Sequence, residues 1–235
     1  MWNELTSNQF LWIALTAGLY ILGGKLKSKW PNNPLFNPLV FAIIVIIVIL
    51  LVFNIPLETY SEKSELFSLL ITPATVALAI KLEQNFDYFK KYYPAIIIGI
   101  VTGVVFHTLL LYSIALLLRL DSSLVATLLP KSITTAIAVD VSNSLGGVVS
   151  LTVGFVVFTG VLGSLIGPWI LKVFKIDDPV AQGVALGSSA HAVGTSKAIE
   201  MGEVQGAMSG VSIVVTGITV VALAPLAGVI TGWLF

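Results

Sequence analysis

Five long stretches of this 235-residue chain contain no aspartate, glutamate, lysine or arginine. They are residues 5–24, 30–57, 92–118, 141–171 and 204–235. A helix needs about 20 mostly apolar residues to cross a bilayer core about 30 Å thick, and each stretch is long enough. Only 10% of the residues are charged and 57% are hydrophobic, whereas roughly a quarter of a soluble domain is charged. A water-soluble fold is therefore excluded, and we expect an all-α integral membrane protein.

The charged and metal-binding residues exclude several classes of function. Twelve basic residues balance twelve acidic ones, which argues against nucleic-acid binding, because that affinity depends on neutralising phosphates. The chain has no cysteine and two histidines, so a disulfide, a thiolate metal site and a zinc centre are not expected. No spacing suggests an activated nucleophile. We therefore expect neither an enzyme nor a metal site, and no cofactor beyond a possible coupling proton or sodium ion.

Three further segments resemble interrupted membrane helices. Residues 66–80 are broken by Pro73, and residues 179–196 are rich in glycine, serine and alanine. Residues 122–147 contain two short apolar stretches and are expected to form a helical pair or a re-entrant hairpin broken near Pro130. An ordinary helix with a proline kink is the alternative for 66–80, because neighbouring hydroxyl groups can satisfy the freed backbone.

Three groups of lysines predict the orientation of the chain, because basic residues in short loops stay in the cytoplasm. The groups are Lys25, Lys27 and Lys29; Lys81, Lys90 and Lys91; and Lys172 with Lys175. If residues 66–80 and 179–196 each cross once, all three groups lie inside. The N-terminus is then outside, the C-terminus is inside, and the chain makes about eight crossings.

The order of span, interrupted segment and span occurs twice in opposite senses. The first set is 38–54, 66–80 and 94–118, and the second is 148–170, 179–200 and 204–234. We therefore predict one transmembrane domain, residues 1–235, built as an inverted repeat with halves of about 1–118 and 119–235. Inverted repeats with interrupted helices indicate the midplane binding site of a secondary transporter.

Three clusters place hydroxyl groups, glycines and charges where lipid-facing residues would be apolar. The predicted substrate-binding residues are Thr72, Pro73, Thr75, Lys131, Ser132, Thr134, Thr135, Ser188, Ser189, His191, Gly194, Thr195 and Ser196. Lys131 follows Pro130 and precedes a run that can start a helix, so an ammonium, hydroxyl groups and free N–H groups would favour an anion there. The candidates for carrying a coupling ion are Asp140, Lys197 and Glu200, with His191 as a further candidate for a proton.

Each of these residues also has a purely structural interpretation. Lys131 could extend to the headgroups, and Asp140 could end a helix and face water. His191 could be packed and hydrogen-bonded, as we expect for His107 in its apolar stretch. Lys197 and Glu200 could pair on one helix face. Close helix packing is the preferred interpretation of five glycines, which are Gly99, Gly103, Gly160, Gly163 and Gly167.

Several motifs of the chain resemble those of the LrgB/CidB family. They are Pro73–Ala79, Pro130–Ala138, Ala185–Thr195, and Glu200–Glu203 followed by Gly206–Gly210. The motifs occur in the order and spacing of that family, and the resemblance extends from about Asn37 to the C-terminus. The family's motifs map onto Pro73, Thr75, Lys131, Ser132, Thr134, Thr135, Ser189, His191, Gly194 and Thr195.

The resemblance implies two different functions. Bacterial members are described as antiholin-like proteins or regulators of murein hydrolase export, which act with a small holin-like partner of the LrgA/CidA type. Related proteins, including a plastid glycolate/glycerate translocator, move small carboxylates. We therefore expect a multi-pass protein of the bacterial plasma membrane, dimeric, that transports a small monocarboxylate such as glycolate, glycerate or pyruvate. The alternative is an antiholin-like regulator of autolysis.

Overall fold

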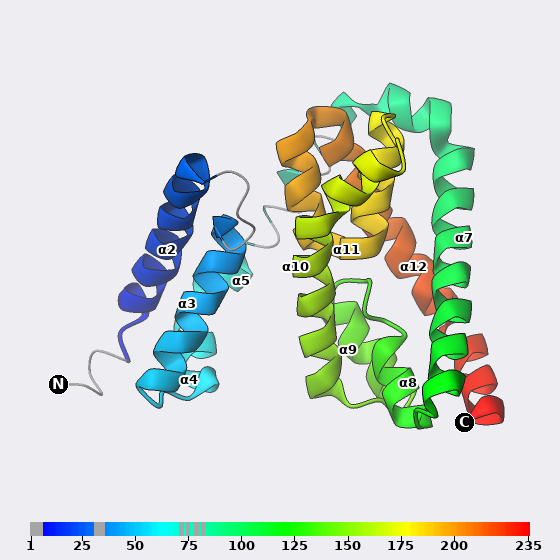
Figure 1. The fold of residues 1–235 in the computed structure, drawn as a ribbon, viewed down its shortest axis with the longest axis horizontal. Helices are drawn as coiled ribbons and strands as arrows, with labels where there is room; N and C mark the ends of the chain where they lie inside the picture. The colour runs from blue at the N-terminus through cyan, green and yellow to red at the C-terminus, as the bar shows by residue number, and fades with distance from the viewer. Residues whose placement is uncertain (1–6, 31–35, 71–72, 74–75, 78–79, 81–82) are drawn as a thin grey trace. The chain divides into compact units, whose positions relative to one another are not determined.

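The computed structural model describes residues 7–30, 36–70, 73, 76–77, 80 and 83–235. These residues form helices and no β-strand, which confirms the all-α membrane class. The chain divides into two compact units, residues 1–77 and 78–235 (Figure 1). The predicted boundary between repeat halves, near residue 118, stays a prediction.

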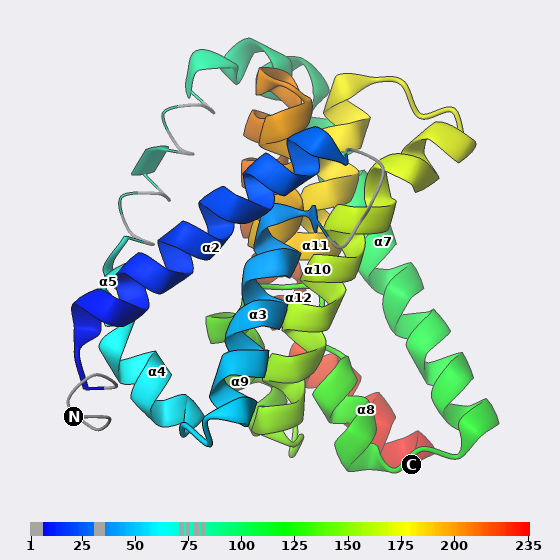
Figure 2. The ribbon, with the colours of Figure 1, turned by 60° about the vertical axis from the view of Figure 1, so that its left-hand side comes forward.

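The first unit packs two apolar helices side by side. They are α2 (Gln9–Lys29) and α3 (Pro38–Val52), followed by the short α4 (Leu57–Lys63) and α5 (Glu65–Leu69) (Figure 2). Gly23 permits the close approach of α2 and α3, because a Cβ atom there would lie 2.8 Å from the Cα atom of Pro38. At 15 residues, α3 is shorter than the roughly 20 residues that a full crossing needs.

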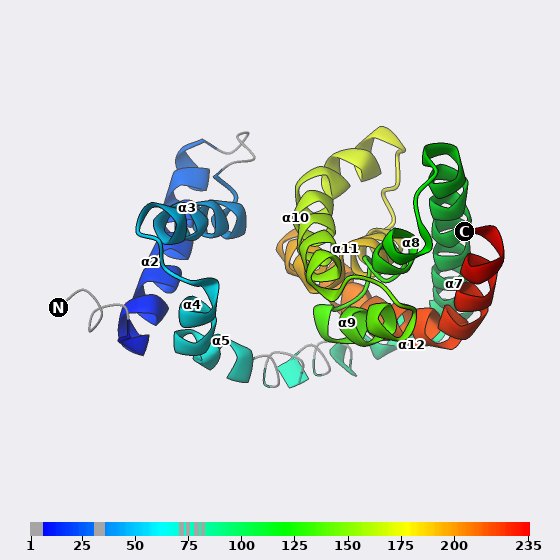
Figure 3. The ribbon, with the colours of Figure 1, turned by 90° about the horizontal axis from the view of Figure 1, so that it is seen from below.

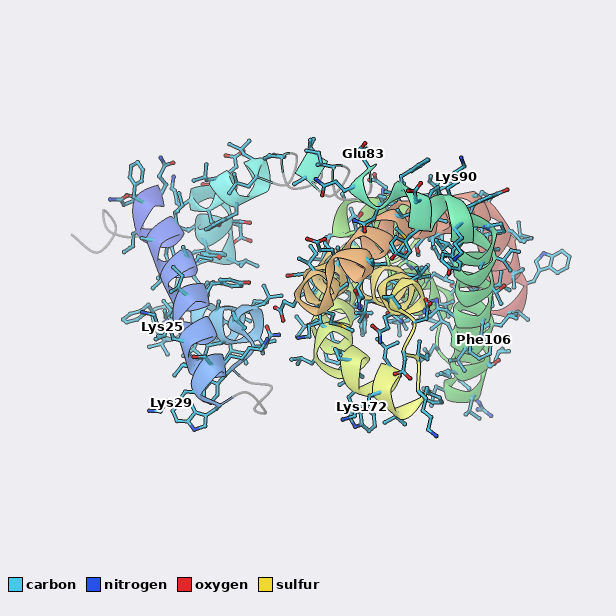
Figure 4. The ribbon with its side chains drawn as sticks, turned by 90° about the horizontal axis from the view of Figure 1, so that it is seen from above. Lys25, Lys29, Glu83, Lys90, Phe106 and Lys172 are labelled. Carbon is cyan, nitrogen blue, oxygen red and sulfur yellow. The ribbon has the colours of Figure 1, made fainter. Side chains whose placement is uncertain are left out.

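The second unit contains three long helices, α7 (Phe86–Leu118), α10 (Val149–Val173) and α12 (Glu203–Leu234). Together with α2 they are the four helices that are long and apolar enough to cross a membrane in the described part of the chain. Four of the five predicted spans are thereby confirmed. Their outer faces are apolar: Phe106, which is 66% exposed, lies on the outer side of α7 (Figure 4).

Two clusters of buried residues define the directions of these helices. Ile96 and Ile100 near the start of α7 pack with Ala207 near the start of α12. Tyr112 near the end of α7 packs with Phe235, and its hydroxyl group donates to the carbonyl oxygen of Ala227 at 2.8 Å. The two helices are therefore parallel, and α10 runs the opposite way (Figure 1). We call the end of the unit with Lys90, Lys91, Lys172 and Lys175 the lysine end, and the other the C-terminal end.

The short helices α8 (Ser122–Leu128) and α9 (Thr135–Ser144) form a hairpin that enters from the C-terminal end (Figure 1). With 7 and 10 residues they are about 10 and 15 Å long, too short to cross a bilayer. Viewed from below, α8 lies between α7 and α10 (Figure 3). The hydroxyl group of Thr152 on α10 holds the hairpin, since it lies 2.6 Å from the Ser142 hydroxyl and 3.3 Å from the Thr127 carbonyl oxygen. The predicted hairpin broken near Pro130 is confirmed.

The helix α11 (Pro179–Met201) is also a hairpin, because its backbone is non-helical at Ala190 and His191. A Cβ atom on Gly194 would collide with the carbonyl oxygen of Leu186, although residues eight apart in a continuous helix are separated by about 12 Å. The chain has therefore reversed, and both ends of α11 lie at the lysine end, beside the start of α12.

This reversal corrects one sequence-based expectation. Residues 179–196 were expected to cross the membrane once, whereas α11 enters and leaves at the same end. The prediction of an interruption is confirmed, but the crossing that placed the C-terminus inside is absent. In the matching segment of the predicted repeat, 66–80, residues 71–72, 74–75 and 78–79 lie outside the described residues, so the repeat stays a prediction.

Candidate functional site

The two hairpins approach one another from opposite ends (Figure 1). A partly open cavity of about 760 Å³ lies beside their tips. Its wall is formed by α7, by the connection between α8 and α9, by α10 and by the first arm of α11. Six polar side chains line it: His107, Lys131, Ser132, Thr159, Ser188 and Ser189. We call it the Lys131 cavity. Four of the thirteen predicted substrate-binding residues are thus brought together.

Lys131 and Ser132 lie at the tip of the hairpin formed by α8 and α9. Buried Pro130 begins a tight turn there, in which the backbone N–H of Ile133 donates to the carbonyl oxygen of Pro130 at 3.2 Å. Both Lys131 and Ser132 are half-buried. Among the described residues that line the cavity, Lys131 is the one charged side chain. The cavity therefore offers an ammonium group without a neighbouring carboxylate, which favours an anion.

Ser188 and Ser189 immediately precede the break in α11 at Ala190 and His191. The hydroxyl group of Ser189 donates to the carbonyl oxygen of Ala185 at 2.6 Å, and Ser188 makes a longer contact of 3.4 Å with the same oxygen. Each hydroxyl oxygen keeps the capacity to accept a further hydrogen bond. These groups supply the second polar side of the cavity.

His191 and Thr195 form the inside of the α11 tip and do not line the Lys131 cavity. His191 is 5% exposed, and its Nε2 atom lies 3.0 Å from the Val156 carbonyl oxygen. Its ring packs against Gly160. A Cβ atom at residue 160 would lie only 2.6 Å from Cε1 of His191. The Thr195 hydroxyl donates to the His191 carbonyl oxygen at 3.0 Å and contacts the Ser209 hydroxyl at 2.7 Å. These contacts stabilise a residue with a φ of 42°.

The remaining predicted residues lie elsewhere. Gly194 packs against Leu186 within α11, Thr134 precedes the first residue of α9, and Thr135 and Ser196 are exposed. Pro73 is exposed, and Thr72 and Thr75 lie outside the described residues.

The predicted coupling residues also lie away from the Lys131 cavity. Asp140 is exposed beside a separate hollow between α9 and α12. Lys197 and Glu200 form an ion pair of 2.8 Å. For the part of the chain that the structure describes, no group of three or more histidine or acidic residues is placed to hold a metal ion.

Two polar residues of the cavity were not among the predicted site residues: Thr159 on α10 and His107 on α7. His107 was expected to be packed and hydrogen-bonded, but its Nε2 atom has no hydrogen-bond partner among the described residues. It follows outward-facing Phe106, and the helical turn of about 100° per residue directs it to the interior. A signal was present in the sequence: Gly103 and His107 are four residues apart, so they share one helix face, and both line the cavity. That this face lines a cavity became clear only from the structure, which shows the other segments around it.

The fold and the site define a class: a helical membrane protein in which two re-entrant hairpins meet at a cavity that contains a half-buried lysine. The model of the LrgB-like family matches residues 16–229, and the chain belongs to this family.

Several relatives match over most of their length. An uncharacterized protein, YwbG, of Bacillus subtilis (strain 168) is 38% identical over 211 residues, which cover 90% of this chain and 93% of the relative. Antiholin-like protein LrgB of Bacillus mycoides (strain KBAB4) is 38% identical over 221 residues, covering 94% and 96%. The protein of the same name from Bacillus subtilis (strain 168) is 34% identical over 223 residues, covering 95% and 96%. No solved structure matches the chain.

Proposed function

We propose that this protein is a secondary transporter of a small monocarboxylate such as glycolate, glycerate or pyruvate. The observation that carries the proposal is the Lys131 cavity, in which a half-buried ammonium without a neighbouring carboxylate faces hydroxyl groups at the tips of two opposed hairpins. Broken helices that meet near the middle of the membrane are typical of the binding sites of secondary transporters.

The polar groups of the cavity suit one carboxylate. An ammonium donates a strong, charge-assisted hydrogen bond to a carboxylate oxygen, and the adjacent Ser132 hydroxyl supplies a second donor. Ser188 and Ser189 lie on the opposing hairpin. Movement of one hairpin relative to the other would expose the bound anion alternately at the two ends. A coupling proton or sodium ion, and assembly as a homodimer, belong to the same proposal.

Transport by the purified protein in liposomes tests the proposal. Labelled glycolate and labelled pyruvate are supplied outside, and uptake is measured against liposomes without protein. We expect saturable uptake of at least one of the two acids. Uptake that rises only in proportion to concentration, as in empty liposomes, would contradict a transport function.

We also propose an orientation, with the lysine end of unit 78–235 in the cytoplasm of a bacterial cell. Lys90, Lys91, Lys172 and Lys175 are exposed at that end, and basic residues in short loops remain inside. Because α12 ends at the opposite end, the C-terminus would then be outside. This replaces the earlier expectation of an inside C-terminus, which depended on a crossing by α11.

Cysteine labelling tests this orientation, because the natural chain contains no cysteine. In intact cells a membrane-impermeant maleimide is expected to label Ser122→Cys, which is exposed at the C-terminal end. The matched variant Lys175→Cys should react only after the cells are permeabilised. The reverse pattern would overturn the proposed orientation.

The names of the relatives favour a second candidate function more directly than they favour transport. Two of them are antiholin-like proteins that match nearly the whole chain. In this alternative, the protein regulates autolysis together with a small holin-like partner, and the Lys131 cavity is dispensable. Autolysis of cells that express Lys131→Met distinguishes the two functions: a regulator that carries no solute should retain normal control of lysis.

A further inference from the structure

A second cavity of about 320 Å³ adjoins the Lys131 cavity. It lies between α7, α9 and α12 and extends from His107 and Thr216 to Leu116 and Leu234 near the C-terminal end. His107 and Ser132 line both cavities. We call the second one the apolar cavity, because most of its wall consists of leucine, valine, isoleucine and alanine. Among the described residues that line it, none carries a fixed charge.

Two polar atoms in the wall of the apolar cavity are buried without a hydrogen-bond partner among the described residues. They are Nε2 of His107 and Oγ1 of Thr216. Thr216 is 1% exposed. Leaving such a group without a partner costs about 1–3 kcal/mol, and inside a membrane bulk water is not present to compensate.

Thr216 differs from the other hydroxyl residues of α12. Ser212, Thr219 and Thr231 each donate to the carbonyl oxygen four residues earlier, at 2.7, 2.7 and 2.8 Å. Thr216 makes no such bond in the structure, so its buried hydroxyl group has neither a donor nor an acceptor partner among the described residues. His107 supplies the second group from α7. Facing helices thus offer a small molecule one hydroxyl donor and one ring nitrogen, which accepts when Nδ1 carries the proton.

The ligand that matches these groups is neutral. A carboxylate anion would be costly in a cavity without a balancing charge. A protonated carboxylic acid instead provides one O–H donor for His107 Nε2 and one C=O acceptor for the Thr216 hydroxyl, and its hydrocarbon part suits the apolar wall. The acid takes its proton from water before it enters, and no other bond is made or broken.

We propose that His107 and Thr216 form a second binding site on the solute path, which takes a small carboxylic acid in its neutral, protonated form. The solute would pass between the Lys131 cavity and the apolar cavity beside Ser132 and His107. The part of this inference that concerns transport rests on the proposed function, whereas the binding site itself can be tested without it.

Histidine NMR provides the binding test, since the chain contains only two histidines. The protein is labelled with ¹⁵N-histidine, and the two ring signals are assigned with His107→Gln and His191→Gln. Propionate is then added at a pH at which part of it is protonated, and also at neutral pH. We expect the His107 signals to move at the acidic pH and to move much less at the neutral pH. His191, whose ring is bonded to Val156, serves as the internal control at each pH.

A pair of threonine variants tests the proposed partner. Thr216→Val removes the hydroxyl group with little change in shape and should weaken propionate binding about fivefold to tenfold, the effect of losing one hydrogen bond. Thr219→Val is the matched control, because its hydroxyl group bonds within α12, and binding should be unchanged. An unmoved His107 signal, or an equal shift at neutral pH, would overturn the proposal; the unpartnered atoms would then be hydrated or would bind the anion.

Uptake into liposomes separates this inference from the proposed function. Thr216→Val and His107→Phe are expected to reduce uptake of pyruvate or glycolate about tenfold, and His107→Gln to retain more of it than His107→Phe. If the unaltered protein transports and these variants transport equally well, the second site is wrong and the transport function stands. If the unaltered protein transports neither acid, the transport function is wrong and the NMR result decides the site alone.

Discussion

Gly187→Ala is expected to destabilise the protein by about 2–3 kcal/mol, in the range found when a packed interior is overfilled. A Cβ atom at residue 187 would lie 2.8 Å from the hydroxyl oxygen of Ser209 and closer still to its carbonyl oxygen. The carbonyl group belongs to α12 and cannot rotate away. Since Ser209 also contacts Thr195, the substitution would push the whole α11 hairpin from α12. In detergent, the unfolding temperature of this variant should be about 5–10 °C lower than that of the unaltered protein.

Gly154→Ala is the matched control for this prediction. It lies within α10, and a Cβ atom there would meet nothing within 4 Å. Alanine favours a helix over glycine by about 1 kcal/mol, so this variant should unfold at the same temperature as the unaltered protein or slightly higher. If Gly187→Ala and Gly154→Ala unfold alike, the close docking of α11 on α12 is incorrect.

The long helices could be predicted from the sequence because the bilayer imposes a simple requirement. A crossing segment must be long, apolar and free of charge, so the stretch 204–235 predicts α12 (Glu203–Leu234) to within about one residue. The hairpin of α8 and α9 could also be predicted, since the two apolar stretches that flank Lys131 are each too short to cross the membrane.

The reversal within α11 could not be predicted in the same way. It depends on a positive φ at His191 and on three-dimensional contacts, such as the one between Gly194 and Leu186. The polar cluster indicated that the segment was unusual but not the direction in which the chain continued. The sequence-based topology therefore contains one membrane crossing too many before the C-terminus.

The glycines show how far a residue type determines its role. Close packing is confirmed for Gly160, Gly163 and Gly167, which contact His191, Ala190 and Leu186 of α11 in turn. Gly99 and Gly103 were given the same interpretation, but a Cβ atom at either would meet nothing within 4 Å of the described residues. The spacing of glycines along a helix identifies a face without side chains. Whether another helix packs against that face depends on the fold.

The site was predicted in part for a related reason. Lys131, Ser132, Ser188 and Ser189 were found because polar residues in an apolar segment are conspicuous, and both segments reach one cavity. His107 was interpreted as a packed residue because it is a single polar residue in an apolar helix. Its importance follows from the two cavities that it lines, and each cavity is completed by residues more than 20 positions away in the chain.

The burial of Lys131 is expected to favour anion binding but not the stability of the folded state. It is half-buried, and none of the described residues that line its cavity is acidic. Holding an ammonium group there costs solvation energy without an ion pair to compensate. A neutral residue of similar shape should therefore leave the folded state as stable as before, or more stable, even if the site loses its function.

Lys131→Met is expected to reduce carboxylate uptake about 100-fold, because truncating one partner of a buried, hydrogen-bonded charge pair costs about 2–5 kcal/mol and a factor of 100 corresponds to about 2.8 kcal/mol. Uptake of labelled glycolate or pyruvate measures the loss, and the unfolding temperature should not fall. Lys131→Arg keeps the charge and should retain more uptake than Lys131→Met, whereas Lys90→Met at the exposed lysine end should transport normally. Equal uptake by Lys131→Met and Lys90→Met would show that the ammonium group in the cavity does not bind the solute.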